Sequence, residues 1–149
     1  RVLVVSDSHG MIGRLGNILM AAEAEGPLDA VIHLGDGYCD LDEFAQNGLP
    51  PRYQVAGNAI WAGQQEIITL SGARLLLTLG HRYQVRQGVE SLLGEARQEK
   101  VQAALYGHTH LQKCQWEGGL LLLNPGAAMD GRYAILRINR LGAVEAQLH

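Results

Sequence analysis

Five short apolar runs in this sequence each stop at a small residue, and side chains that can bind a metal ion follow. Each run has the length of a buried strand. Because ligands of open α/β sheets bind outside the carboxyl ends of the strands, we expect these side chains to converge. The runs and the groups they deliver are VLVVSDSHG with Asp7 and His9, AVIHLGDG with Asp36, YQVAGN with Asn58, LLLTLGH with His81, and AALYGHTH with His108 and His110.

Carboxylate, amide and imidazole groups together make a mixed oxygen and nitrogen ligand set. Such a set suits Mn, Fe, Co, Ni or Zn better than Mg or Ca. We expect one or two divalent transition ions per chain, with Mn preferred over Ni, Fe, Co and Zn, and with Asp36 as the bridge if there are two. Two metals about 3.5–4 Å apart can clamp a phosphoryl group and hold a hydroxide for in-line attack. The pattern therefore predicts hydrolysis of phosphate esters.

Helical patterns lie between some of the runs. Apolar stripes at helical spacing predict helices over Gly13–Glu25 and Gly88–Lys100, and Leu41–Gln46 could form a shorter one. Buried strands that alternate with amphipathic helices indicate an α/β fold. Residues 67–79 are predicted to form a hairpin that turns at Ser71-Gly72. The C-terminal segments QKCQW, LLLLN, YAILRI and AVEAQL are predicted strands without helices between them, joined in antiparallel pairs.

Size and composition limit the classes of function. A chain of 149 residues with 47% hydrophobic residues is expected to form one domain, 1–149, around an aliphatic core. A net charge of −3 without a cluster of Lys and Arg gives no basic patch for nucleic acid. Two cysteines are too few for a disulfide framework and favour a reducing cytoplasm. No apolar run approaches the ~20 residues that cross a membrane.

Taken singly, a pair such as G-D or G-N is an ordinary turn, but the ordered set is specific. D-x-H, G-D, G-N and G-H-T-H in this order resemble the calcineurin-like metallophosphoesterase superfamily, and within it the small single-domain phosphodiesterases of bacteria and archaea. The resemblance runs from Val2 to about Ile138 and includes NPG at Asn124–Gly126. It implies a two-sheet α/β sandwich with outer helices and a metal site at the C-terminal ends of the strands. It also implies a metal-dependent phosphodiesterase whose metal-bound hydroxide attacks a small phosphate ester.

The resemblance also assigns ligands. One ion would be held by Asp7, His9, Asp36 and His110, and the other by Asp36, Asn58 and His108, with Asp36, Asn58 and His108 as the catalytic residues. A histidine from the fourth motif, which usually reads T-H-G-H, would complete the second set. Here the tetrad is Thr78-Leu79-Gly80-His81, so Leu79 occupies the ligand position. His81 falls two residues later, about 6–7 Å along an extended segment. The second site is therefore expected to be weakened, and His81 and Arg82 to contact the substrate or the ligands.

A second departure follows the third motif, where relatives often have Cys-Asp or His-Asp and this chain has Asn58-Ala59-Ile60. In larger family members a histidine there helps bind substrate or protonate the leaving group, and general acid catalysis contributes ~10²–10⁴-fold. The alternative function is a catalytically reduced member that serves as a metal-binding or protein-interaction scaffold, as the retromer scaffold subunit of this family does. Six retained ligand residues of seven favour the enzyme.

Three other features have simpler interpretations. His33 lies inside a predicted strand and is expected to be a core histidine bonded to a neighbour. Arg14 is expected on a solvated helix face. Strand edges near residues 112–123 could pair with a second copy of the chain, so a homo-oligomer is one expectation for partners, beside the small phosphate ester.

Overall fold

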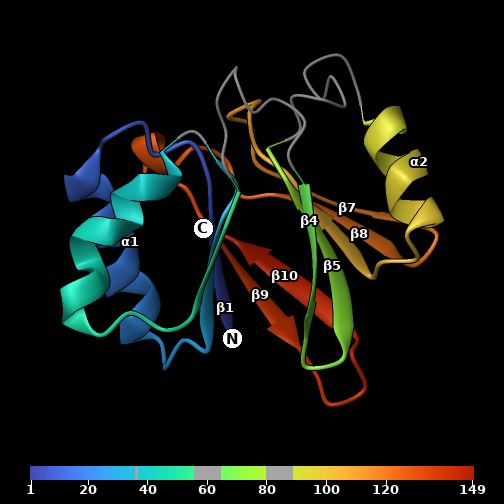
Figure 1. Ribbon diagram of the computed structural model, residues 1–149, viewed down its shortest axis with the longest axis horizontal. Coiled ribbons are helices and arrows are strands. Elements are labelled where there is room, and N and C mark those ends of the chain that lie inside the picture. The colour runs from blue at the N-terminus through green and yellow to red at the C-terminus, as the bar shows by residue number, and fades with distance from the viewer. Residues whose placement is uncertain (36, 56–64, 80–88) are drawn as a thin grey trace.

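The computed structural model describes residues 1–35, 37–55, 65–79 and 89–149. In these ranges the strands form two five-stranded sheets that face each other, and α1 and α2 lie on opposite sides of the pair (Figure 1). This arrangement is the two-sheet α/β sandwich that the sequence predicts.

Sheet A contains the first three of the predicted strands. Its strand order is β10-β9-β1-β2-β3, in which β1, β2 and β3 run parallel and β9 is antiparallel to both β1 and β10. The last residue of β1 is paired with the last residue of β2, Val5 with His33, so the two strands end at the same edge. The strands span Val2–Val5 (β1), Ala30–His33 (β2), Arg52–Gln54 (β3), Ala134–Ile138 (β9) and Val144–Leu148 (β10).

Sheet B contains the last two predicted strand ends. Its order is β4-β5-β6-β8-β7, in which β5, β6 and β8 run parallel while β4 and β7 are antiparallel to their neighbours. The strands span Gln65–Leu70 (β4), Ala73–Thr78 (β5), Ala103–Leu105 (β6), Lys113–Glu117 (β7) and Leu120–Asn124 (β8). The predicted hairpin at Ser71-Gly72 is confirmed by the antiparallel pairing of β4 with β5.

The predicted helices are present with small differences in their limits. Helix α1 spans Ile12–Ala24 and α2 spans Glu90–Gln98, while the expected helix at Leu41–Gln46 is a longer 3-10 helix, η1, at Tyr38–Asn47. A second 3-10 helix, η3, covers Ala128–Asp130. None of the helices within the described ranges is long and apolar enough to cross a membrane.

Three apolar layers hold the sandwich together. The central one lies between the sheets and is almost entirely aliphatic, with Val4, Leu77, Leu105 and Leu121 among its fully buried members. Leu15, Ile18, Leu19 and Ala22 of α1 pack on the outer face of sheet A, and Leu92 and Ala96 of α2 pack on the outer face of sheet B. Because both faces of β1, β2 and β6 are covered, these strands read as continuous apolar runs rather than as alternating ones.

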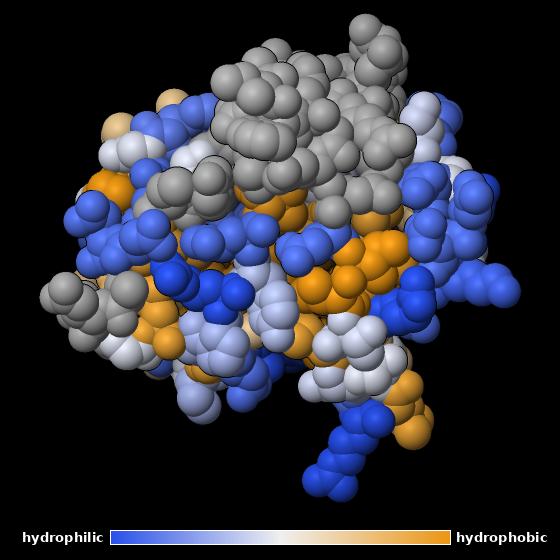
Figure 2. Space-filling view, viewed as in Figure 1, coloured by the Kyte–Doolittle hydropathy of each residue, from blue (hydrophilic) through white to orange (hydrophobic). Residues whose placement is uncertain are grey.

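The edge strand β7 carries exposed apolar side chains. Trp116 is 53% exposed, and Leu111, just before the strand, is 73% exposed. Figure 2 shows a mainly hydrophilic face with hydrophobic surface near its centre. Pairing of this edge with a second copy remains a prediction.

Candidate metal centre

The loops after β1 and β6 bring Asp7, His9 and His110 together where the two sheets meet. The Oδ1 atom of Asp7 lies 3.3 Å from Nε2 of His110 and 3.6 Å from Nε2 of His9. One ligand atom from each residue lies within 4.8 Å of the other two. Asp7 follows a strand of sheet A and His110 follows a strand of sheet B, so the cluster exists only when the sandwich is assembled.

The cluster is closed on one side and open on the other. The Asp7 side chain is fully buried, whereas those of His9 and His110 are 38% and 33% exposed. The two imidazole rings are 5.4 Å apart between centroids and tilted by 56°. A cation could therefore enter between the imidazoles and meet the carboxylate beneath them.

The Asp7 carboxylate is fixed by hydrogen bonds on its other oxygen. Oδ2 accepts one from the Ser6 hydroxyl at 2.6 Å and one from the backbone N–H of His108 at 3.0 Å. Charge-assisted bonds of this kind are short and directional. They leave Oδ1 facing the two histidines.

The donor set fits a divalent transition ion. One carboxylate oxygen and two imidazole nitrogens suit Mn, Fe, Co, Ni or Zn better than Mg or Ca, which prefer oxygen alone. Within the described ranges, the backbone of His108 contacts Asp7, and its imidazole is not one of the three clustered donors.

The backbone at these residues is strained. The φ angles of Asp7, His9, His108 and His110 are +55°, +47°, +72° and +63°, and they are four of the six non-glycine residues with positive φ in the described chain. Such conformations cost of order 1–3 kcal/mol each and persist where the surroundings impose them. The loop at Asp7 is held by a hydrogen bond from its N–H to the Gly35 carbonyl at 2.9 Å.

Gly107 allows the second loop to approach the first. A Cβ at this position would overlap the Ser6 hydroxyl and lie 2.8 Å from Asp7 Oδ2. The first residue of G-H-T-H is therefore a glycine that lets this loop pack directly against Ser6 and Asp7. The Gly107 N–H also donates to the Leu79 carbonyl at 3.1 Å, which links this loop to the end of β5.

Asn124, the first residue of the NPG motif, supports the same loop. It is fully buried, its Nδ2 donates to Thr109 Oγ1 at 2.9 Å, and its Oδ1 accepts from the Gly126 N–H at 2.9 Å. Thr109 is the residue between the two histidines of G-H-T-H. Sequence reasoning noted the motif without assigning this role.

His33 is buried and bonded to a neighbour, as predicted. Its Nε2 lies 2.9 Å from Ser8 Oγ, and its Nδ1 accepts a hydrogen bond from the Gly35 N–H at 3.1 Å. Burial lowers the pKa of His33 to about 4, and the nearby Asp40 carboxylate opposes part of that shift. The ring is therefore neutral at pH 7.

Of the residues predicted for the second site and its surroundings, Leu79 and His108 lie within the described ranges. Leu79 is described, and its side chain is buried, with 7% exposed. The weakened second site remains a prediction, because Asp36 and Asn58, two of its proposed ligands, are not among the described residues. The remaining site residues and the departure after Asn58 lie outside the described residues: Asp36, Asn58, Ala59, His81 and Arg82.

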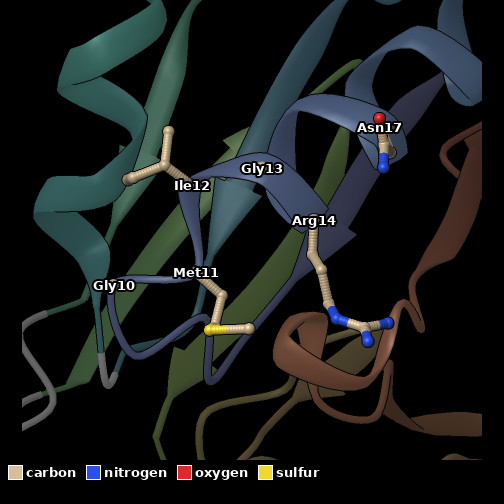
Figure 3. A pocket seen from close by; sticks show the side chains of 6 residues that line it. All are labelled: Gly10, Met11, Ile12, Gly13, Arg14 and Asn17. Atoms are coloured by element: carbon tan, nitrogen blue, oxygen red, sulfur yellow. The ribbon is translucent and has the colours of Figure 1, made fainter.

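A pocket begins at Gly10, the residue after His9. It is lined by residues of the loop and of the first turns of α1, among them Met11, Arg14 and Asn17 (Figure 3). Arg14 is exposed, as predicted, and extends toward η3, where a Cβ on Gly131 would lie 3.7 Å from its Nη1. The pocket lining includes the residue that follows His9, but none of the three clustered donors.

Replacing Gly107 with alanine should disturb the cluster directly. The added Cβ would push on Ser6 and on the Asp7 carboxylate, so we expect Mn²⁺ affinity to fall about 10–100-fold, as it does when groups that orient metal ligands are lost. Isothermal titration with Mn²⁺ measures this. Gly94→Ala is the matched control, since a Cβ there meets nothing within 4 Å in α2; it should leave Mn²⁺ affinity unchanged. Equal affinities for all three proteins would contradict the role given to Gly107.

The buried neutral His33 should make the fold sensitive to acid. Its pKa is about 4 in the folded protein and 6.5 ordinarily, so the unfolded chain binds this proton first as the pH falls. Stability that is present above pH 6.5 is therefore lost as the pH falls toward 4, by about 3 kcal/mol in total.

The test compares urea unfolding of the unsubstituted protein and of His33→Gln between pH 7 and pH 4, with chelator present. The difference between their unfolding free energies should narrow by about 3 kcal/mol as the pH falls. A difference that stays constant over this range would contradict the shift.

Known proteins resemble this chain over nearly its whole length. The sequence model of the calcineurin-like phosphoesterase superfamily domain matches residues 1–140. A relative from Bacillus subtilis, probable metallophosphoesterase YsnB, is 33% identical over 146 residues, which cover 92% of this chain and 83% of the relative.

Two solved structures share the fold. An archaeal phosphodiesterase has a TM-score of 0.75 at 17% identity, with 99% of each chain covered. Vps29 of Entamoeba histolytica in complex with Zn²⁺ has a TM-score of 0.73 at 22% identity, with 99% of this chain and 97% of that chain covered. Together with the ordered motifs and the Asp7, His9 and His110 cluster, the sequence match shows that this chain belongs to the calcineurin-like phosphoesterase superfamily.

Proposed function

We propose that this protein is a metal-dependent phosphodiesterase. The observation that carries the proposal is the cluster of Asp7, His9 and His110 at the junction of the two sheets. One ion is held by these three residues and Asp36. A second, weaker site uses Asp36, Asn58 and His108, and the preferred ion is Mn²⁺.

The described residues support metal binding by their fixed geometry. Asp7 is oriented by Ser6 and by the His108 N–H, so its Oδ1 faces the imidazoles of His9 and His110. Preorganised ligands of this kind lose little freedom on binding. When bound, a divalent transition ion supplies Lewis acidity, which activates water and neutralises charge on phosphoryl oxygens. The partly exposed imidazoles leave an approach for the phosphate ester from solvent.

The proposed substrates are small phosphodiesters with good leaving groups. Ala59 cannot protonate a departing alkoxide, so an aryl or other low-pKa leaving group suits this chain best. The fold shared with an archaeal phosphodiesterase agrees with this class without assigning it. The cysteine usage favours a cytoplasmic location.

A catalytically reduced scaffold is the second candidate. Its support is the buried apolar Leu79 in the position where relatives place a ligand, together with Ala59. Vps29 of Entamoeba histolytica shares the fold, and its crystal structure is a complex with Zn²⁺. Hydrolysis assays separate the two candidates.

Mn²⁺ should support hydrolysis of an activated aryl phosphodiester, and chelator should remove it. Asp36→Ala should lower kcat/KM by more than about 100-fold, since it removes the bridging ligand. The control is Asp42→Ala, which removes an exposed carboxylate that pairs with Arg52 at 2.7 Å. Hydrolysis that survives both chelator and Asp36→Ala would overturn the metal mechanism.

Leu79→His should strengthen the second site by restoring the ligand of the family motif. We expect metal content, measured by elemental analysis, to rise toward two ions per chain, and hydrolysis to rise with it. Leu79→Asn is the control, because it makes the same buried position polar without supplying an imidazole. If the unsubstituted protein already holds two ions and Leu79→His changes neither quantity, Leu79 is not a deficit.

A further inference from the structure

A network of hydrogen bonds lies beside the metal cluster and contains none of its ligands. Ser8 and His33 in it are fully buried, and Asp40 is partly exposed. Ser8 Oγ lies 2.9 Å from His33 Nε2 and 2.6 Å from Asp40 Oδ2. The same Asp40 oxygen accepts the backbone N–H of Gly10 at 2.7 Å. The network therefore joins the end of β2, the loop after β1 and the helix η1.

The protons in this hydrogen-bond network have one consistent arrangement. Because the Gly35 N–H donates to Nδ1 of a neutral His33, the ring proton is on Nε2 and is donated to Ser8 Oγ. Ser8 then donates its own proton to Asp40, with the Gly37 carbonyl at 3.2 Å as a second acceptor. Each polar group has a defined partner, which is the condition under which a buried network stabilises one geometry.

The hydrogen-bond network holds the backbone on both sides of His9. Ser8 precedes His9 and Gly10 follows it, and both are bonded to the same carboxylate oxygen. His9 itself has φ of +47°, a conformation that its surroundings must impose. A Cβ on Gly37 would lie 2.7 Å from the His9 nitrogen and 2.8 Å from Asp40 Oδ2, so there is little room for another arrangement.

The three side chains resemble a Ser-His-Asp triad in composition, but their geometry differs. Asp40 bonds to the serine hydroxyl instead of the histidine, and Ser8 and His33 are fully buried. A nucleophile needs access to substrate and a base that removes its proton. Ser8, His33 and Asp40 therefore form a structural network and not a catalytic triad.

We propose that Ser8, His33 and Asp40 are positioning residues that hold the His9 loop in its strained, metal-ready conformation. This inference rests on the proposed function, because it concerns affinity for the same ion. Asp40 follows Asp36 by four residues in sequence, so the hydrogen-bond network also ties the His9 loop to the segment that carries the proposed bridging ligand.

The first test uses Asp40→Asn with Asp42→Asn as its matched control. Both residues lie on η1, but Asp42 is exposed and pairs with Arg52. Asparagine at position 40 keeps the size but removes the negative charge, so the hydrogen bonds from Ser8 and Gly10 lose their charge-assisted strength. We expect Mn²⁺ affinity, measured by the electron paramagnetic resonance signal of free Mn²⁺, to fall about 10–100-fold in Asp40→Asn only.

A metal-free measurement accompanies the titration. In chelator, the Gly10 amide should lose protection from hydrogen exchange in Asp40→Asn and keep it in Asp42→Asn, because only Asp40 accepts its hydrogen bond. A merely structural role would lower thermal stability without this local change.

Ser8→Ala and Ser8→Thr keep the inference testable if Asp40→Asn does not fold. Ser8→Ala removes the hydroxyl and should weaken Mn²⁺ binding as Asp40→Asn does. Ser8→Thr retains the hydroxyl and should restore binding. Because the groups act in one network, the double variant Ser8→Ala/Asp40→Asn should lose less Mn²⁺-binding free energy than the two single variants lose together.

The outcomes separate the inference from the proposed function. Unchanged Mn²⁺ affinity in Asp40→Asn and Ser8→Ala, or an equal loss in Asp42→Asn, overturns the positioning role and leaves the proposed function standing. Absence of Mn²⁺ binding by the unsubstituted protein overturns the proposed function and the inference with it.

Discussion

The buried carboxylate of Asp7 is the group on which the geometry of the candidate site depends. It lies in the loop after β1 of sheet A, and a backbone N–H from the loop after β6 of sheet B completes its hydrogen bonds. A carboxylate that is fully removed from water is stable only with compensating donors or positive charge. Ser6, the His108 N–H and the two imidazoles supply that environment. The same carboxylate therefore links the two sheets and forms part of the metal cluster.

Strain at the cluster is balanced by polar residues that are not metal ligands. Asp7, His9, His108 and His110 have positive φ, which is unfavourable for each of them. Two separate groups of hydrogen bonds hold the loops. One joins the buried Ser8 and His33 to Asp40, and the other joins the buried Asn124 to Thr109. Each loop is thus fixed from behind, which leaves the imidazoles partly exposed to solvent. Precise loops of this kind need buried support, because a loop by itself has too few contacts to keep an unfavourable conformation.

Much of the fold followed from the sequence because parallel strands end at a common edge. Continuous apolar runs gave the buried strands, and the residues after two of them, Asp7 and His110, do meet. The type of η1 and the hydrogen bonds of Ser8 and Asp40 did not follow, because they depend on how loops distant in sequence pack. For the same reason, the sequence could not show that His108 contacts Asp7 through its backbone. Spacing predicts which groups arrive at an edge, and the loops decide which atom of each group faces its neighbour.

The two proposed metal sites differ in how closely the fold depends on their residues. Asp7 bonds to groups from both sheets, so its loss would expose donors on each side. The hydrogen bond described for Leu79 uses its backbone carbonyl, which accepts from the Gly107 N–H and which any residue could supply. Its apolar side chain is buried. The fold can therefore keep its loops in place with leucine at position 79. The ligand of the second site can be lost without loss of the first, because the first is built from groups that also hold the sandwich together.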